Sequence, residues 1–187
     1  AADSLKLAAQ ANLPEALNDY GAILADGLKP WIGVHRDELA AVSRECFDAV
    51  LEHRLFRGGI QLVEAHRSRG TPVVLLSSTS PFLLEEVGRY LQCDGVLATR
   101  FVFDGDRLTD QLDGPLVFGE GKREVATAYA EKEGVTLKEC AFYSDSASDL
   151  PLLRAVGHPR AVNPDRVLKR ECKRSGWPII EFRRTLG

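Results

Sequence analysis

Residues 143–153 read YSDSASDLPLL, and this stretch decides the fold class more than any other part of the chain. The residues just before it, Cys-Ala-Phe-Tyr at 140–143, form an apolar run typical of a strand buried on both faces. Asp145 then falls at the tip of the strand, and Asp149 falls on the following turn. Neighbouring carboxylates repel each other unless a cation is present, and Mg²⁺ prefers carboxylate oxygens. The pattern predicts a Mg²⁺ site; an aspartate-rich helix N-cap is the alternative interpretation.

Strands and helices alternate through the second half of the chain, which is typical of a parallel sheet covered by helices on both faces. The first half shows helical spacing only, with an N-cap expected at Asp37 and a helix break at Gly58 and Gly59. We therefore predict a small α-helical cap over residues 1–57 and an α/β core over residues 58–187. Strands are expected at residues 72–76, 140–143, 160–162 and 178–182 and a hairpin at 101–112, with helices at 81–91, 121–133 and 164–175.

Two further stretches lie where an α/β sheet places its active site. Ser78, Thr79 and Ser80 follow the first predicted strand and precede a helix, so their hydroxyls and the free helical N–H groups could hold a phosphate. Lys122 follows Gly121 at the start of another helix and would bring a fixed positive charge to that phosphate. Each stretch also has a plainer interpretation, an ordinary N-cap in the first case and a solvated surface lysine in the second.

In their order and spacing, these three stretches resemble the motifs of the haloacid dehalogenase (HAD) superfamily, and within it the phosphoserine-phosphatase-like subfamily IB. The resemblance is carried by LLSSTSP at 75–81, GEGK at 119–122 and YSDSASDLPLL at 143–153, and it extends over nearly the whole chain. It implies a Rossmann-like parallel sheet with a helical cap, and a Mg²⁺-dependent phosphatase that forms an aspartyl-phosphate. By the same resemblance, Ser78 and Lys122 would be catalytic and bind phosphate, and Thr79 would add its backbone N–H. Asp145 would bind the metal directly, and Asp149 would support the metal through water or orient Lys122.

The family's first motif, an apolar strand followed by Asp-x-Asp-x-Thr that supplies the nucleophile, does not precede the predicted cap. The chain contains no methionine, so we expect that an N-terminal segment is missing and that the remaining sheet has two exposed inner edges. Asp104 and Asp106 form a similar pattern, but the Asp-Gly between them favours a hairpin turn. A non-catalytic HAD-like domain used for binding or regulation is the alternative function.

Composition limits the partners of the protein. A net charge of -3 disfavours nucleic acid, and no apolar run is long enough to cross a membrane. The four cysteines have no metal-ligand spacing and indicate reduced thiols in a cytoplasmic protein. The glycine-rich loops of nucleotide-binding domains are absent from the sequence, and a receiver domain would need no helical cap. We expect a small-molecule phosphate monoester as the substrate, and a homodimer remains open as the oligomeric state.

Overall fold

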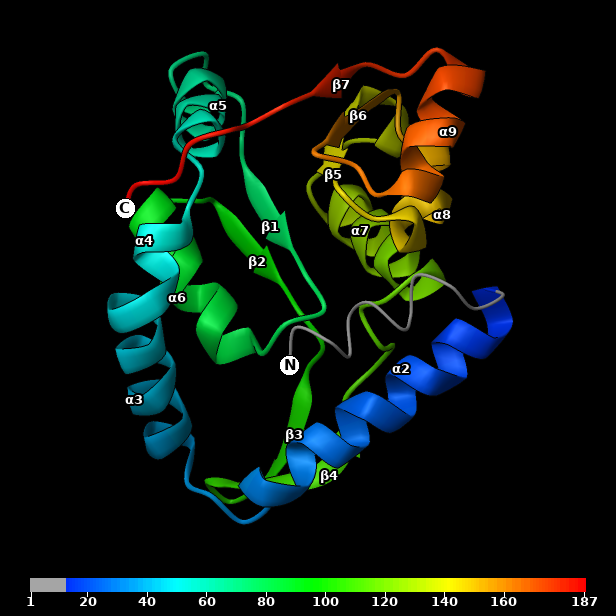
Figure 1. Ribbon diagram of the computed structural model, residues 1–187. Helices are drawn as coiled ribbons and strands as arrows, with labels where there is room; N and C mark the ends of the chain where they lie inside the picture. The colour runs from blue at the N-terminus through cyan, green and yellow to red at the C-terminus, as the bar shows by residue number, and fades with distance from the viewer. Residues whose placement is uncertain (1–12) are drawn as a thin grey trace. The chain divides into compact units, whose positions relative to one another are not determined.

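A computed structural model describes residues 13–187, and the contacts within it divide the chain into two compact units. Unit 1 comprises the chain up to Pro30 together with Pro115–Glu181, and unit 2 comprises Trp31–Gly114 and Phe182–Gly187. Each unit contains parallel strands and helices, which confirms the predicted α/β class (Figure 1). The division does not fall at residue 57, and the assignment of residues 1–57 to a cap remains a prediction.

The sheet of unit 2 has two parallel strands, β1 (Val74–Leu76) and β2 (Gly95–Leu97), joined by helix α6 (Pro81–Leu91). The helix packs against β2 on one side and against α3 (Arg36–Cys46) on the other. The remaining elements of the unit are a π-helical turn at Phe47–Leu51, α4 (Glu52–Arg54), α5 (Arg57–Arg67), and the antiparallel hairpin of β3 (Phe101–Asp104) and β4 (Arg107–Leu112).

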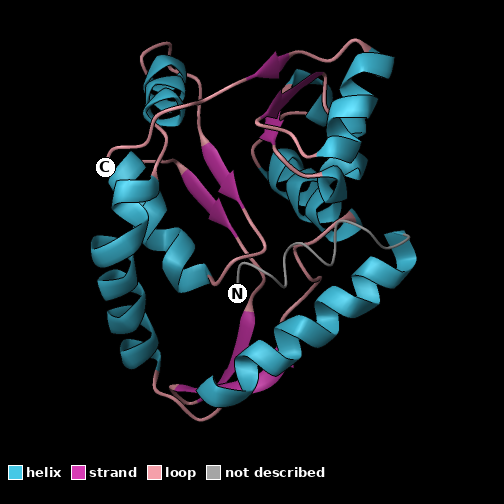
Figure 2. Ribbon diagram, in the orientation of Figure 1, coloured by secondary structure: helices cyan, strands magenta, loops and turns pink. Residues whose placement is uncertain are grey.

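Unit 1 is built on three parallel strands in the order β5 (Ala141–Ser144), β6 (His158–Val162) and β7 (Ile179–Ile180). Figure 2 shows these strands among helices. The buried core of the unit joins Leu153, Ala161, Leu168 and Cys172, which come from two helices and the central strand. The helices of the unit are α2 (Leu13–Leu28), α7 (Glu120–Lys132), α8 (Leu150–Ala155) and α9 (Arg166–Ser175). The unit also contains the 3-10 turns η3 (Leu137–Glu139) and η4 (Ala147–Asp149), and a further 3-10 turn at Lys29–Trp31 ends in unit 2.

The parallel strands form two separate sheets rather than one continuous sheet. Within residues 13–187, β1 pairs only with β2, and β5 pairs only with β6. Each of these two strands therefore keeps one edge without a strand partner in the described part of the chain. Every open sheet ends in strands with one unpaired edge, so the two exposed inner edges expected from a missing strand stay a prediction.

Three predicted boundaries were wrong, and one strand was missed. The predicted helix break falls at Leu55 and Phe56, whereas Gly58 lies inside α5, where any Cβ would meet the ring of Phe182 at 2.4 Å. His35 rather than Asp37 caps α3, because its ring accepts a hydrogen bond from the Asp37 N–H. Helix α9 begins after Asp165 rather than at Pro164, and the short strand β2 was not predicted at all.

The other strands and helix α7 lie within two residues of the predicted bounds, and the hairpin and helix α6 match them. Residues 1–12, where the first part of the helix expected at 3–25 falls, lie outside the described residues. Among the helices that the structure describes, none is both long and apolar enough to span a membrane.

Candidate active site

The loop after β5 carries the two aspartates singled out in the sequence. Strand β5 ends at Ser144, whose Oγ accepts a hydrogen bond from the Ser146 N–H at 3.1 Å and so turns the chain sharply. The single turn η4 then brings the chain to Asp149, which lies at the N-cap position of α8 and is 3% exposed. The turn therefore separates the two carboxylates, with Asp149 inside the protein and Asp145 exposed at its surface.

Lys122 and Asp149 form a buried ion pair within unit 1. The Lys122 Nζ lies 2.8 Å from Asp149 Oδ1 and 2.9 Å from Oδ2, and both side chains are almost completely buried. The Ser144 hydroxyl donates a hydrogen bond of 2.6 Å to the same Oδ2. Removing either charge would leave the other one buried and uncompensated, so the pair fixes the ammonium group of Lys122 in place.

Helix α7 reaches this position because of a glycine. A Cβ on Gly121 would lie 1.9 Å from the carbonyl oxygen of Leu116, so only a residue without a side chain allows the helix to start this close to the preceding loop. Gly121 thus brings Lys122 into reach of Asp149. The plainer interpretation of Lys122, a solvated surface lysine, is wrong, because this residue is only 9% exposed.

Asp145 differs from Asp149 in the contacts of its carboxylate. Its side chain makes no hydrogen bond or ion pair to any residue in the described range 13–187. Its backbone is held instead, because its carbonyl oxygen accepts a hydrogen bond of 2.8 Å from the Asp165 N–H. An exposed carboxylate on a fixed backbone fits a hard cation, and Mg²⁺ commonly binds one or two carboxylates while keeping several waters.

The described residues supply only part of a metal site. No group of three or more histidine, cysteine, aspartate or glutamate side chains within residues 13–187 is placed to hold a metal ion. Asp149 is engaged by Lys122 on both of its oxygens. Of the two predicted metal residues, Asp145 is thus the one free to coordinate a cation directly, whereas Asp149 makes the Lys122 contact.

The loop after β1, in unit 2, contains the hydroxyl groups predicted to hold phosphate. Residues 77–80 are all half-buried, and Ser80 caps α6 with Pro81 in the first turn, as predicted. The Thr79 N–H, predicted to bind phosphate, donates to Ser77 Oγ at 3.2 Å. A bound phosphate would therefore have to share or replace this long hydrogen bond. Ser78 and Thr79 belong to unit 2, whereas the other three predicted residues belong to unit 1.

The second Asp-x-Asp pattern is a hairpin tip, as expected. Asp104, Gly105 and Asp106 are exposed at the turn between β3 and β4, and Gly105 has a φ of 57°. Two residues that hold the loop after β5 were missed in the sequence, Ser144 at the end of β5 and Asp165 at the start of α9. The fact that Ser144 ends an apolar strand just before Asp145 could have indicated the first, and the Pro-Asp pair at a predicted helix start could have indicated the second.

Comparison with known proteins identifies the family of the chain. The model of the haloacid dehalogenase-like hydrolase family matches residues 9–154. Histidinol-phosphatase of Neisseria meningitidis serogroup C (strain 8013) is 32% identical over 169 residues, which cover 88% of this chain and 76% of that protein. Phosphoserine phosphatase SerB1 of Mycobacterium tuberculosis is 34% identical over 146 residues, which cover 78% of this chain and 47% of that protein.

A solved structure also matches at the level of sequence and fold. A Bordetella pertussis Tohama I protein of unknown function is similar with a TM-score of 0.74 and 30% identity, over 78% of this chain and 67% of that chain. The parallel strands and the helices around them define the chain as a protein of the α/β class. The chain belongs to the haloacid dehalogenase-like hydrolase family. It spans about half the length of several curated relatives that it matches.

Proposed function

We propose that this chain is the phosphate- and cation-binding part of a Mg²⁺-dependent phosphomonoester hydrolase. The observation that carries the proposal is the β5 loop, where Asp149 forms a buried pair with Lys122 and Asp145, four residues earlier, is exposed and has no side-chain partner among residues 13–187. A loop that served only as a helix cap would need neither a buried lysine nor a carboxylate left without a partner. Membership of a hydrolase family supports the same reaction class.

Each assigned residue would have a separate task, Ser78 and Thr79 within unit 2 and the other three within unit 1. Ser78 would donate its hydroxyl to a phosphoryl oxygen, and Thr79 would add its backbone N–H beside the N-terminus of α6. Lys122 would lower the cost of the negative charge that gathers as the phosphoryl group is transferred. Asp149 would hold the Lys122 ammonium group in position, since it contacts that group through both oxygens.

Asp145 would hold the cation. When bound, Mg²⁺ would neutralise phosphoryl oxygen charge and orient the ester, as it does in other phosphoryl-transfer sites. Asp145 presents a carboxylate with no competing partner in the described part of the chain, and waters can complete much of the coordination sphere of Mg²⁺. The carboxylate oxygens of Asp145 are thus suitable ligands for Mg²⁺, and any further protein ligands would come from residues other than the five assigned here.

The proposed covalent step follows the family resemblance. A nucleophilic aspartate would form a bond to phosphorus while the ester P–O bond breaks, and the alcohol would leave after taking up a proton from a general acid. Water would then cleave the aspartyl-phosphate to give inorganic phosphate and the free aspartate. None of the five residues assigned here takes the role of this nucleophile.

The proposed substrate is a small phosphate monoester. The names of two relatives specify phosphoserine and histidinol phosphate, both of which are phosphate esters of small molecules that carry an amino group. The two named substrates differ from each other, so they support a phosphate monoester as the substrate class but do not specify one compound. The remainder of the substrate would be selected by residues outside the two strand-end loops.

Hydrolysis of p-nitrophenyl phosphate by the complete protein tests this proposal. We expect turnover in Mg²⁺, none in EDTA, and none in the Asp145→Asn variant. Asp104→Asn is the matched control, because Asp104 is an exposed aspartate in the other Asp-x-Asp pattern, and its activity should equal that of the wild type. Activity that survives EDTA or Asp145→Asn would refute the metal assignment. A complete protein without turnover on any phosphate monoester would favour the non-catalytic alternative.

A further inference from the structure

Asp165 makes more contacts with the acidic loop than helix capping requires. It lies between β6 and α9, where its Oδ1 accepts hydrogen bonds from the N–H groups of Val167 at 2.9 Å and Leu168 at 2.8 Å. These two bonds satisfy the start of α9 in the ordinary way. Its other oxygen, Oδ2, accepts a third hydrogen bond of 2.7 Å from the Ala147 N–H, 18 residues earlier in the chain.

The backbone of Asp165 binds the same loop on its other side. The Asp165 N–H donates to the carbonyl oxygen of Asp145 at 2.8 Å, two residues before the Ala147 contact. The two hydrogen bonds therefore enclose the segment from Asp145 to Ala147, which we call the acidic turn. Both ends of the acidic turn are fixed to a single residue, which restricts the direction in which the Asp145 side chain leaves the backbone.

Asp165 is itself anchored in the core of unit 1. Leu168, one of the residues whose N–H it caps, is fully buried in the cluster with Leu153, Ala161 and Cys172. The acidic turn is thus attached to a helix that cannot shift without disturbing the core. The Asp165 carboxylate is satisfied by three backbone N–H groups, so it is unsuited to coordinate a cation directly.

We propose that Asp165 is a positioning residue for the cation, acting through the acidic turn to hold the Asp145 carboxylate in the geometry that binds Mg²⁺. This inference rests on the proposed function, since it takes Asp145 as the cation ligand. Outer residues that orient a metal ligand commonly change metal affinity by about 10- to 100-fold when they are replaced. A residue that served only as an N-cap would instead change stability and leave the affinity unaltered.

The Asp165→Ser variant separates the two roles. Serine is a good N-cap and can still accept from the start of α9, but its side chain is too short to reach the Ala147 N–H as well. Asp165→Ala removes all three side-chain contacts. Thr136→Ala is the matched control, because Thr136 caps η3 in the same unit through a capping box with Glu139 and has no contact with the acidic turn.

The measurement is a Mg²⁺ titration of the 187-residue chain, followed through the amide resonance of Asp145, together with hydrogen exchange of the Ala147 amide. For Asp165→Ser we expect exchange at Ala147 to be faster by about 10-fold or more, because the amide loses its acceptor. We also expect Mg²⁺ affinity to be weaker by roughly 10-fold, with a nearly unchanged melting temperature. Asp165→Ala should show the same loss of affinity with an added loss of stability, and Thr136→Ala should lose stability alone.

Three results would overturn the inference, and they are distinguishable. Wild-type Mg²⁺ affinity in Asp165→Ser, with the Ala147 amide exposed to exchange, would show that the contact does not position Asp145, while the proposed function stood. An equal loss of affinity in Thr136→Ala would assign the effect to general stability. A wild-type chain whose Asp145 resonance does not respond to Mg²⁺ would remove the cation assignment and this inference together.

Discussion

Two loops of the molecule begin with the same turn and are then stabilised in different ways. Ser77, directly after β1, accepts a hydrogen bond at its Oγ from the N–H two residues ahead at 3.2 Å, and Ser144, the last residue of β5, does the same at 3.1 Å. Only the second serine hydroxyl also donates, to the buried carboxylate of Asp149 at 2.6 Å. The β5 loop is further held by Asp165, through contacts at Asp145 and Ala147.

The difference reflects the charge that each loop carries. A buried carboxylate needs partners in fixed positions, and the β5 loop supplies a lysine, a hydroxyl and a fixed backbone for this purpose. The β1 loop carries no charge of its own, and its capacity to bind an anion comes from hydroxyl groups and the N-terminus of α6. We therefore expect mutations in the β5 loop to affect stability strongly, and equivalent mutations in the β1 loop to affect it little.

The largest effect is expected for Lys122→Met. This variant leaves Asp149 buried without its countercharge, and breaking a buried pair in this way costs about 3–5 kcal/mol in the free energy of unfolding. Urea denaturation of the wild type and the variant measures the loss. The double variant Lys122→Met/Asp149→Leu removes both charges and should recover much of the stability; if it is no more stable than the single variant, the charge is not the cause.

Gly121→Ala should have the next largest effect. The added Cβ would overlap the Leu116 carbonyl oxygen, so the start of α7 must move, at a cost of about 3 kcal/mol. Gly27→Ala is the control, because Gly27 lies in α2 with no other atom within 4 Å of the added carbon, and there alanine should stabilise by up to about 1 kcal/mol. Equal effects at the two positions would contradict the close approach at Gly121.

The two turn serines allow the comparison between the loops to be tested directly. Ser144→Ala removes a hydrogen bond to a buried charged group and should cost about 2 kcal/mol, whereas Ser77→Ala removes a single long backbone contact and should cost about 1 kcal/mol or less. Thermal and urea unfolding of both variants provide the measurement. A loss at Ser77 that equals or exceeds the loss at Ser144 would show that the two loops do not differ in the way described.

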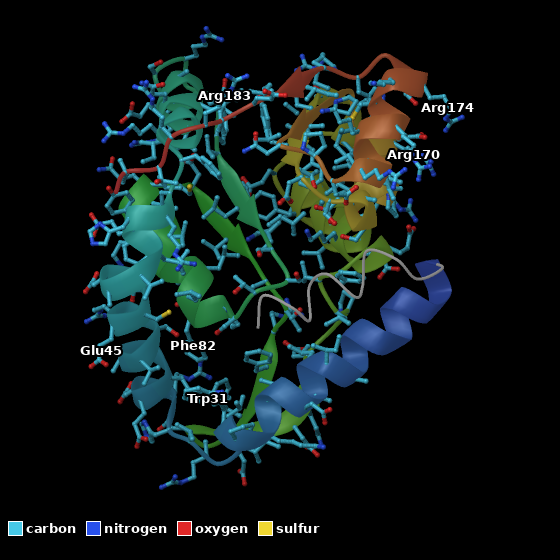
Figure 3. All side chains as sticks on the ribbon, viewed as in Figure 1. Trp31, Glu45, Phe82, Arg170, Arg174 and Arg183 are labelled. Atoms are coloured by element: carbon cyan, nitrogen blue, oxygen red, sulfur yellow. The ribbon has the colours of Figure 1, made fainter. Side chains whose placement is uncertain are left out.

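The smallest effect is expected away from the β5 loop, at Glu171 of α9, which pairs with Arg154 of α8 and Arg174 of α9. Hydrogen bonds from Arg174 and Arg154 lower the pKa of the Glu171 carboxyl from 4.5 to about 2. Arg174 projects from α9 into solvent (Figure 3), which screens the interaction, so Glu171→Gln should cost about 1 kcal/mol or less at neutral pH.

The pH dependence of the Glu171 contribution has a defined sign. Because its pKa is lower in the folded protein, the contribution is complete above the unfolded pKa near 4.5 and is lost as the pH falls toward about 2. The stability difference between wild type and Glu171→Gln should therefore shrink steadily across this range, as measured by urea denaturation at each pH. A difference that grew at low pH would contradict the lowered pKa.

Local signals in the sequence were sufficient to predict most elements of the fold. The Asp-Gly turn placed the hairpin, Ser80 with Pro81 placed the start of α6, and the apolar runs placed β1 and β5. Strand β2 was missed because Gly95–Leu97 is too short to show any periodicity, and it is defined by its ladder with β1. Gly58 was misread as a helix break because the residue that requires a glycine there, Phe182, lies far along the chain.

In the candidate site, too, local sequence signals indicated single residues, whereas contacts between distant residues could not be predicted. Lys122, Asp145 and Asp149 could be named from spacing and resemblance, because their residue types are unusual at strand ends and helix starts. The bidentate contact between Lys122 and Asp149, which lie 27 residues apart, depends on how α7 packs on the β5 loop, and no local pattern specifies this. Asp165 was missed for a similar reason, since its second oxygen contacts a residue 18 positions away.

The most direct test of the central claim is to locate the cation with a paramagnetic probe. Mn²⁺ added in small amounts to the isotope-labelled 187-residue chain should broaden the amide resonances of Asp145 and Ser146 before those of other exposed acidic segments, including the hairpin tip at Asp104. In the Asp145→Asn variant this selective broadening should disappear. Broadening that begins at the hairpin tip, or that persists unchanged at residues 145–146 in Asp145→Asn, would contradict the assignment of Asp145 as the cation ligand.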